Sequence, residues 1–215
     1  MKARYDLYVI TDEHLSFGLT HLEIAKRAIA GGADVIQLRD KERKSAQLLP
    51  IAKEINDHAR SRGVMFIVND MIEVALSANA HGVHLGQDDL PLQDARRMTP
   101  PGFIIGISAT SVEQAIEAER DGADYVALGP IFPTASKKDA ADACGIEMLK
   151  EVRASILIPL VAIGGINTSN IAEVIAAGAD GVAVISSVVS QPDVTRSAIE
   201  LKRLIVGARS NSIQR

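Results

Sequence analysis

Two aspartates that follow neighbouring apolar runs of the chain could together hold a divalent cation. Asp70 ends one run, and Asp89 lies shortly after the next. Mg²⁺ in proteins takes one or two carboxylates, several waters and the oxygens of a substrate phosphate. Capping of the following helix is the alternative role, for Asp88 or Asp89. His81 and His84 are not predicted ligands, because side chains three apart on a strand face opposite ways.

Three basic side chains are expected at the same end of the fold as these aspartates. Arg39 and Lys41 come at and just after the end of an apolar run, and Lys137 lies in a long loop after a later run. Three cations and a metal ion exceed what a single phosphate monoester requires. They suit a diphosphate, because fixed positive charge stabilises the negative charge that develops when diphosphate leaves a substrate. The residue types therefore predict a site that binds a diphosphate and promotes its departure.

The loop over residues 129–145 is longer than a usual connection between a strand and the following helix. It carries Thr134, Ser136 and Lys137, whose hydroxyls and ammonium group could bind an anion. A loop of this kind can close over a bound substrate as a lid. The alternative, on composition alone, is an inserted surface loop without a role in the site.

Two late turns carry small residues that suit a phosphate group. Gly164 and Gly165 follow the apolar run 160–163, and Ser186 follows the run after it. Glycine lets the backbone approach an anion closely, and backbone N–H groups at a helix start can bind it. A tight turn without a ligand is the simpler interpretation of the glycine pair alone. The position of these turns after the last two predicted strands favours a phosphate site.

These residues follow short apolar runs that alternate with helical segments along the whole chain. Eight such runs with helices between them close a (β/α)8 TIM barrel, in which catalytic residues stand at the carboxyl ends of the strands. An open doubly wound sheet is the alternative, although residues 11–14 (Thr-Asp-Glu-His) lack the glycine-rich dinucleotide fingerprint. The predicted strands cover residues 7–10, 35–39, 64–69, 82–85, 104–108, 125–128, 160–163 and 181–185, and the clearest predicted helices cover 45–62, 111–121 and 170–177.

The turns that lead into the strands share a short phrase. Gly-Ala-Asp recurs at 32–34, 122–124 and 178–180, and residues 81–84 (His-Gly-Val-His) are a looser copy. A glycine here suits the end of a helix, and the next residues enter a buried strand. These turns mark the amino ends of the strands, where we expect residues to serve stability rather than chemistry.

Alternation along the second run separates its polar and apolar side chains. Ile36 and Leu38 share the face that packs on helices, whereas Gln37 and Arg39 share the face that points into the barrel. Unpaired polar groups are costly in a dry core. We therefore expect Gln37 and Arg39 near the top of the barrel, at the rim of the anion site.

Composition argues against several other classes of protein. The chain has 215 residues, a formal net charge of -4 and 3% aromatic residues, so it lacks the basic stripe and stacking platforms typical of nucleic-acid binding. Cys144 is the single cysteine, which excludes an intrachain disulfide, and no histidine motif accompanies it as a nucleophile. Residues 1–12 lack a signal-peptide pattern, and no run approaches the roughly 20 apolar residues of a membrane span. We expect one domain over residues 1–215 in the cytoplasm, binding small molecules and neither nucleic acid nor membrane, with assembly into a homo-oligomer left open.

The short motifs at the strand ends resemble those of the thiamine-phosphate synthase family over nearly the whole chain. Each motif is weak alone, but the set in this order on eight predicted strands is specific. The matching residues are Gln37-x-Arg39-x-Lys41, Val68-Asn69-Asp70, His84-Leu85-Gly86-Gln87-Asp88-Asp89, Gly106-Ile107-Ser108, Gly129-Pro130-Ile131-Phe132-Pro133-Thr134, Lys137, Ala162-Ile163-Gly164-Gly165-Ile166 and Ile185-Ser186.

The resemblance implies a role for each matching residue. It implies that the pyrimidine diphosphate is held by Gln37, Arg39, Lys41, Asn69, Ser108 and Lys137, of which Arg39, Ser108 and Lys137 would be catalytic. It also implies that Mg²⁺ is held by Asp70 and Asp89, and the thiazole phosphate by Thr134, Ala135, Ser136, Gly165, Ile185 and Ser186. Ser136 departs from the family pattern, which usually has a second threonine there. Because the hydroxyl is kept, we expect only a small effect on affinity.

The implied activity is that of a transferase. It would join 4-amino-5-hydroxymethyl-2-methylpyrimidine diphosphate to 4-methyl-5-(2-phosphoethyl)thiazole and release diphosphate. The bond between carbon and diphosphate can ionise, and the thiazole nitrogen then captures the cation, so the site needs leaving-group stabilisation and alignment rather than a strong base. The alternatives are a thiazole tautomerase or regulator-like paralogue of the same barrel, a phosphate-binding barrel without catalysis, and, on fold alone, a barrel isomerase. Asn69, Asp70, Asp89 and Lys137 together argue against the paralogue.

Overall fold

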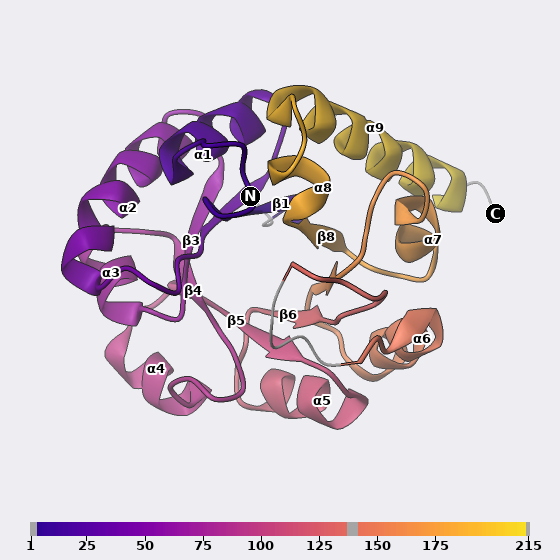
Figure 1. Cartoon of the computed structure of the whole chain (residues 1–215). Coiled ribbons are helices and arrows are strands. Elements are labelled where there is room, and N and C mark those ends of the chain that lie inside the picture. The colour runs from indigo at the N-terminus through magenta and orange to yellow at the C-terminus, as the bar shows by residue number, and fades with distance from the viewer. Residues whose placement is uncertain (1–3, 137–141, 214–215) are drawn as a thin grey trace.

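Parallel strands and helices alternate along the chain. The computed structural model describes residues 4–136 and 142–213. Within these residues, eight parallel strands form a closed barrel in chain order, because β1 (Leu7–Thr11) pairs with both β2 (Val35–Leu38) and β8 (Gly181–Val184). Most of the helices lie around the outside of this barrel, whereas the short helix over Ser186–Val189 lies inside their ring (Figure 1). The predicted (β/α)8 barrel is therefore confirmed, and the open doubly wound sheet is excluded.

The strands lie close to their predicted positions. Each predicted run is a strand, with at most one end displaced by a single residue. β2 ends at Leu38 rather than Arg39, because the Arg39 amide donates to Thr11 Oγ1 (3.4 Å). The strands are β1 (Leu7–Thr11), β2 (Val35–Leu38), β3 (Met65–Asn69), β4 (Gly82–Leu85), β5 (Ile104–Ala109), β6 (Tyr125–Leu128), β7 (Leu160–Ile163) and β8 (Gly181–Val184).

The helices that connect the strands have identifiable starts. The first begins with a capping box, in which Thr20 Oγ1 accepts from the Glu23 amide (3.3 Å) and Glu23 Oε2 accepts from the Thr20 amide (2.9 Å). The three helices predicted most clearly are confirmed with slightly shorter ends. The helices are α1 (His21–Ala30), α2 (Ser45–Arg60), α3 (Ile72–Ser77), α4 (Leu92–Met98), α5 (Val112–Arg120), α6 (Gly145–Ser155), α7 (Ile171–Ala176), α8 (Ser186–Val189) and α9 (Val194–Ile213).

A repeated hydrogen bond ties the amino end of the barrel together. Immediately before β2, β4, β6 and β8, a side chain accepts the amide of the first or second residue of the preceding strand. The pairs are Asp34 with Leu7 (2.9 Å), His81 with Phe66 (3.1 Å), Asp124 with Ile105 (2.7 Å) and Asp180 with Leu160 (2.9 Å). Three of these turns need glycine, since Gly32, Gly122 and Gly178 have φ of 89°, 94° and 106°. In the turn before β4, the equivalent residue is Asn79, with φ of 56°. The recurring phrase therefore serves the frame of the barrel.

A row of polar side chains crosses the inside of the barrel. Gln37 Nε2 donates to Tyr8 Oη (2.8 Å), and Tyr8 Oη lies 2.9 Å from Tyr125 Oη. Tyr125 Oη lies 3.0 Å from His84 Nδ1, and His84 Nε2 lies 2.9 Å from Ser108 Oγ. Gln37 is 2% exposed, so it lies deep in the barrel and not at the rim, where we expected it. The cost of burying this amide is avoided because Tyr8 accepts its hydrogen bond.

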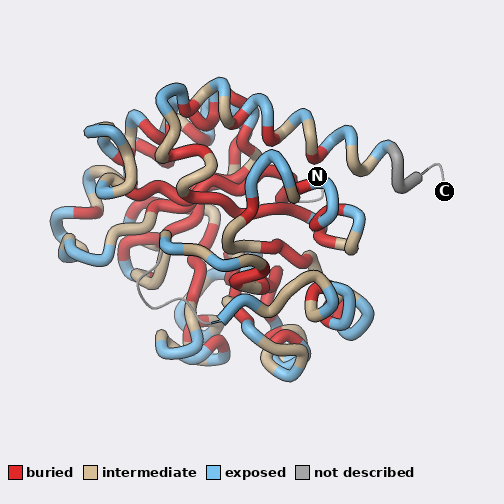
Figure 2. The backbone as a smooth tube through the Cα atoms, turned by 45° about the vertical axis from the view of Figure 1, so that its right-hand side comes forward, coloured by how far each residue is buried: buried red, intermediate tan, exposed pale blue. Residues whose placement is uncertain are grey.

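The apolar core lies between the strands and the surrounding helices. Figure 2 shows buried backbone concentrated in the strands, with exposed residues on the outer turns of the helices. α9 packs against both α1 and α7, so the last helix completes the ring of helices beside the first. In the described ranges, no helix is long and apolar enough to cross a membrane.

Candidate active site

A cavity of about 330 Å³ opens at the carboxyl ends of the strands, with walls formed by the loops after β2 to β8. Most of the predicted site residues line it: Arg39, Lys41, Asn69, Asp70, Asp89, Ser108, Thr134, Ser136, Gly165, Ile185 and Ser186. Gln37 lies deeper in the barrel, and Ala135 lines a neighbouring cavity. Lys137 falls outside the described residues. Residues predicted from separate motifs therefore meet in one place.

Asp70 and Asp89 stand on the loops after β3 and β4, at the wall of this cavity. Asp70 Oδ2 accepts from Lys41 Nζ (2.6 Å), and Asp89 Oδ2 accepts from the Gly86 amide (2.7 Å). Burial raises the pKa of the Asp70 carboxyl above its usual range, and the Asp89 carboxylate raises it further against the opposing effect of Lys41. Two carboxylates that repel each other in this way fit a divalent cation, whose charge would offset the repulsion.

The alternative role of helix capping fits these carboxylates less well. α4 begins at Leu92, after Pro91 at its N-cap, whereas the Asp89 carboxylate closes its own turn on the Gly86 amide. In the part of the chain that the structure describes, no group of three or more His, Cys, Asp or Glu side chains is placed to hold a metal. Asp70 and Asp89 would therefore supply two of the ligands of Mg²⁺, and water and a bound phosphate would supply the others.

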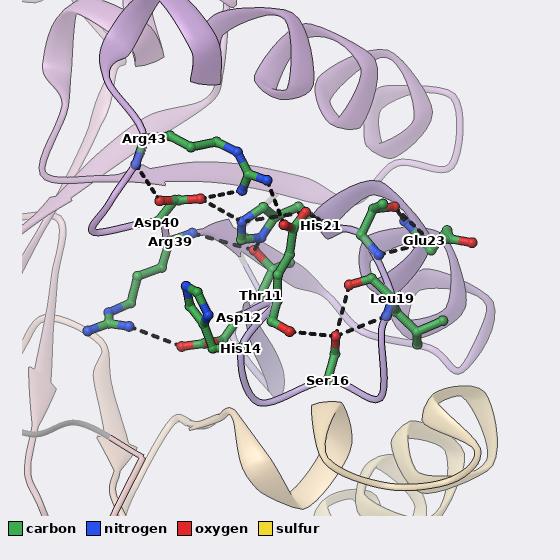
Figure 3. Close-up of polar contacts among 12 residues, drawn as sticks. Thr11, Asp12, His14, Ser16, Leu19, His21, Glu23, Arg39, Asp40 and Arg43 are labelled. Atoms are coloured by element: carbon green, nitrogen blue, oxygen red, sulfur yellow. Dashed lines mark hydrogen bonds and ion pairs between the residues drawn. The ribbon is translucent and has the colours of Figure 1, made fainter.

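Arg39 lies in the cavity wall with its guanidinium paired to a residue that we did not predict. Arg39 Nη1 lies 3.3 Å from Asp12 Oδ2, and each side chain is 11% exposed (Figure 3). Asp12 follows directly after β1, so its place at a strand end was the available signal. The pairing orients the guanidinium in advance, and an anion that enters the cavity would compete with Asp12 for it.

The loop after β6 packs closely on the turn after β7. The Ile131 amide donates to Ile163 O (2.8 Å), and the Phe132 amide donates to Gly164 O (3.1 Å). A side chain at Gly165 would place its Cβ 2.7 Å from Phe132 Cβ, and Gly165 has φ of 65°. The glycine pair, which we interpreted as allowing a phosphate to approach, is thus also needed for the approach of this loop.

Ser136 connects the loop after β6 to the end of β8. Its Oγ lies 3.1 Å from Ser186 Oγ, and its amide donates to Thr134 Oγ1 (3.2 Å). These residues separate the main cavity from a neighbouring cavity of about 350 Å³, which Ala135 and Gly165 also line. The hydroxyls predicted to bind the thiazole phosphate are therefore close together, and Ala135 lies beside them in the wall of the neighbouring cavity.

Ser108 is oriented from inside the barrel by the polar row. His84 Nε2 lies 2.9 Å from its Oγ, and His84 also lines the cavity. We assigned no role to His84 from the sequence, although alternation along β4 points it inward by the reasoning applied to Gln37. Cys144 is half-buried, and burial raises the pKa of its thiol, so the reactive thiolate is disfavoured.

Comparison with known proteins gives consistent matches. Residues 7–188 match the family model described as "Thiamine monophosphate synthase". The thiamine-phosphate synthase of Methanocella arvoryzae is 60% identical over 202 residues, which cover 94% of this chain and 95% of that protein. The thiamine-phosphate synthase of Methanoculleus marisnigri is 55% identical, over 96% of this chain and 98% of that protein. The solved structure of thiamine phosphate pyrophosphorylase from Pyrococcus furiosus is 40% identical, with a TM-score of 0.90 over 96% of this chain and 98% of that one.

Proposed function

Because this chain belongs to the thiamine monophosphate synthase family, we propose that it joins 4-amino-5-hydroxymethyl-2-methylpyrimidine diphosphate to 4-methyl-5-(2-phosphoethyl)thiazole. The products would be thiamine phosphate and diphosphate. The chain is a transferase, as its thiamine-phosphate synthase relatives are.

The observation that carries this proposal is the meeting of three kinds of group around one cavity of about 330 Å³. A diphosphate and a separate phosphate must both be held for this reaction, with their organic parts facing each other. The groups are two cations (Arg39 and Lys41), two carboxylates (Asp70 and Asp89) and two small residues suited to a phosphate (Gly165 and Ser186).

In the proposed reaction, the bond between the methylene carbon and the diphosphate oxygen breaks first, and its electron pair leaves with the oxygen. Arg39 and Lys41 stabilise the charge on this oxygen, and Ser108, oriented by His84, hydrogen-bonds to the same substrate. The lone pair of the thiazole nitrogen then forms a bond to the methylene carbon, which leaves a thiazolium. Alignment of two bound substrates supplies much of the remaining rate enhancement.

The paired carboxylates would complete the diphosphate side of the site. Asp70 and Asp89 would hold Mg²⁺, which supplies further positive charge to a departing diphosphate. Lys41 Nζ donates to Asp70 Oδ2 (2.6 Å), so the ammonium group of Lys41 lies beside one of the two carboxylates that would hold Mg²⁺. On the other side, Gly165, Ile185 and Ser186 would hold the thiazole phosphate, with Ser136 closing over it.

The proposal is tested by initial rates measured with both substrates and Mg²⁺, following diphosphate and thiamine phosphate separately. We expect the two products to form at equal rates, and much slower diphosphate release when the thiazole phosphate is omitted. Lys41→Ala should lower the rate strongly, whereas Lys44→Ala, at the start of α2 and outside the cavity wall, is the matched control. A native protein that binds both compounds but forms no thiamine phosphate would contradict the proposal.

A further inference from the structure

A second charged cluster lies directly behind the cavity wall formed by the loop after β2. The Asp40 cluster consists of Thr11, Glu13, His21, Asp40 and Arg43, which are joined by hydrogen bonds. Figure 3 shows Thr11, His21, Asp40 and Arg43 close together. His21 is at its centre and is 1% exposed. Its Nδ1 lies 2.7 Å from Thr11 Oγ1, and its Nε2 lies 3.1 Å from Asp40 Oδ2.

The cluster closes into a ring through Arg43 and Glu13. Arg43 Nη1 donates to Asp40 Oδ2 (2.5 Å), and Arg43 Nη2 donates to Glu13 Oε2 (2.7 Å). Glu13 Oε1 in turn accepts from the backbone amide of His21 (2.8 Å). The ring therefore joins the loop after β1, the first residue of α1 and the loop after β2.

The residues on either side of this ring face the cavity instead. Arg39 and Lys41 flank Asp40 in sequence, and both line the cavity. Figure 3 shows the Arg39 guanidinium directed away from His21 and toward Asp12, which is the neighbour of Glu13. The loop after β2 thus has one side chain anchored behind the wall and two cations in front of it.

The cluster also holds the backbone of this loop. Asp40 Oδ1 accepts from the amides of Glu42 and Arg43, each at 2.8 Å. Thr11 Oγ1 accepts from the Arg39 amide (3.4 Å), so the Thr11 hydroxyl proton can be donated to His21 Nδ1. His21 thereby contacts both groups that fix the segment from Arg39 to Arg43, which includes Lys41.

The charges of the cluster suit a permanent structural role. Burial lowers the pKa of His21, which favours the neutral imidazole, and the Nε2–H of this imidazole can donate to Asp40. Burial would raise the pKa of Asp40, but the Arg43 and Glu42 amides and the side chains of Arg43 and His21 hold it well below its usual range. Asp40 is therefore a carboxylate at neutral pH, and it accepts these hydrogen bonds without competition from a proton.

We propose that His21 is a positioning residue for the diphosphate, a role that rests on the proposed function. It fixes Asp40 and Thr11, and through them it sets the places of Arg39 and Lys41 in the cavity wall. Cations that are displaced by about 1 Å lose much of their value to a reacting group, and such displacements can cost about a hundredfold. Among the described residues, none of the five members of the Asp40 cluster lines either cavity, so we expect the effect on the pyrimidine diphosphate and not on the thiazole phosphate.

The test compares His21→Phe, which removes both hydrogen bonds and keeps a planar ring, with His21→Gln, whose amide can still donate to Asp40. Binding of inorganic diphosphate with Mg²⁺ is measured by titration calorimetry, and KM is measured for each substrate. We expect His21→Phe to weaken diphosphate binding and to raise KM for the pyrimidine diphosphate by at least about tenfold, with KM for the thiazole phosphate unchanged. His21→Gln should recover a large part of the loss.

Asn56→Leu is the matched control, because Asn56 is equally buried and donates to Ala78 O far from these loops. It should lose stability and bind diphosphate as the native protein does.

Native diphosphate binding in His21→Phe, or equal KM changes for both substrates, overturns the proposal. If His21→Phe does not fold, Arg43→Gln at the more exposed edge of the cluster takes its place, and unchanged diphosphate binding there overturns the proposal equally. A native protein that makes no thiamine phosphate, with diphosphate binding still lost in the variant, contradicts the proposed function but not the positioning role.

Discussion

Asp70 offers a way to separate the charge of a side chain from the backbone shape that carries it. Its φ of 60° is left-handed, a conformation that Asn and Asp adopt more readily than other residues with a Cβ. Asp70→Asn therefore removes the charge and keeps the backbone preference, whereas Asp70→Ala removes both. Comparison of the two variants distinguishes a metal ligand from a residue that only shapes the loop.

The expected stabilities differ by a measurable amount. A left-handed residue other than Gly, Asn or Asp costs about 1–2 kcal/mol. For a chain of this length, 1 kcal/mol moves the melting temperature by about 2–4 °C. Asp70→Ala should therefore melt at least about 2 °C below Asp70→Asn when both are measured without metal.

The sign of the charge effect follows from the pKa of Asp70. Burial and Asp89 raise this pKa, so the folded state binds the proton more tightly than the unfolded chain does. The contribution of Asp70 to stability therefore falls as pH rises from the usual value of 3.8 through the raised pKa. At neutral pH without metal, Asp70→Asn should melt no lower than the native protein, and this relation should disappear in acid.

Both variants should also lose turnover, because the carboxylate that is unfavourable for stability without metal is the group proposed to hold Mg²⁺. Loss of one fixed charge stabiliser typically costs about a hundredfold or more in kcat, and both variants should show it. Mg²⁺ should raise the melting temperature of the native protein and not that of Asp70→Asn, since a ligand that binds only the folded state stabilises it. Full activity of Asp70→Asn, or full native activity in excess chelator, would refute the metal assignment.

Three further outcomes are expected. Gly165→Ala should lower the free energy of unfolding by about 1–3 kcal/mol, because the added Cβ meets Phe132. It should also raise KM for the thiazole phosphate more than KM for the pyrimidine diphosphate. If initial-rate kinetics show the larger rise for the pyrimidine diphosphate, the thiazole phosphate binds elsewhere. Lys137→Ala should lower kcat more than it raises KM, with Lys138→Ala nearly native, and equal small effects would remove Lys137 from the mechanism. Asp40→Asn should be less stable than the native protein at neutral pH, and this difference should shrink in acid as the native protein loses the stability that the lowered pKa of Asp40 confers. This account would be contradicted if the free energy of unfolding, measured with urea, changed with pH in the same way for Asp40→Asn and for the native protein.

The fold and most of the cavity wall could be predicted because they depend on local patterns. The apolar runs located the strands within a residue, and a barrel brings the carboxyl ends of all its strands to one face. The placement of Arg39, Asp70 and Ser108 around one cavity could therefore be predicted from separate motifs.

The depth of Gln37 and the role of His21 depend on partners that are distant in sequence. Gln37 is buried without penalty only because Tyr8 accepts its hydrogen bond from the neighbouring strand. His21 appears on an amphipathic helix as an ordinary polar residue, and only the approach of the loop after β2 gives it Asp40 as a partner. Such contacts follow from the register of the barrel and from loop shape, which no local pattern specifies.

The hydrogen bonds at the amino end of the barrel divide it into quarters. Asp34, His81, Asp124 and Asp180 each reach back to the strand that immediately precedes them in the chain. Every such bond therefore lies inside a unit of two strands, and none joins one unit to the next. A break or an insertion between β2 and β3, β4 and β5, or β6 and β7 would leave all four bonds within continuous pieces of chain. The barrel can in this sense be cut, lengthened or exchanged by quarters without separating these side chains from the strands they hold.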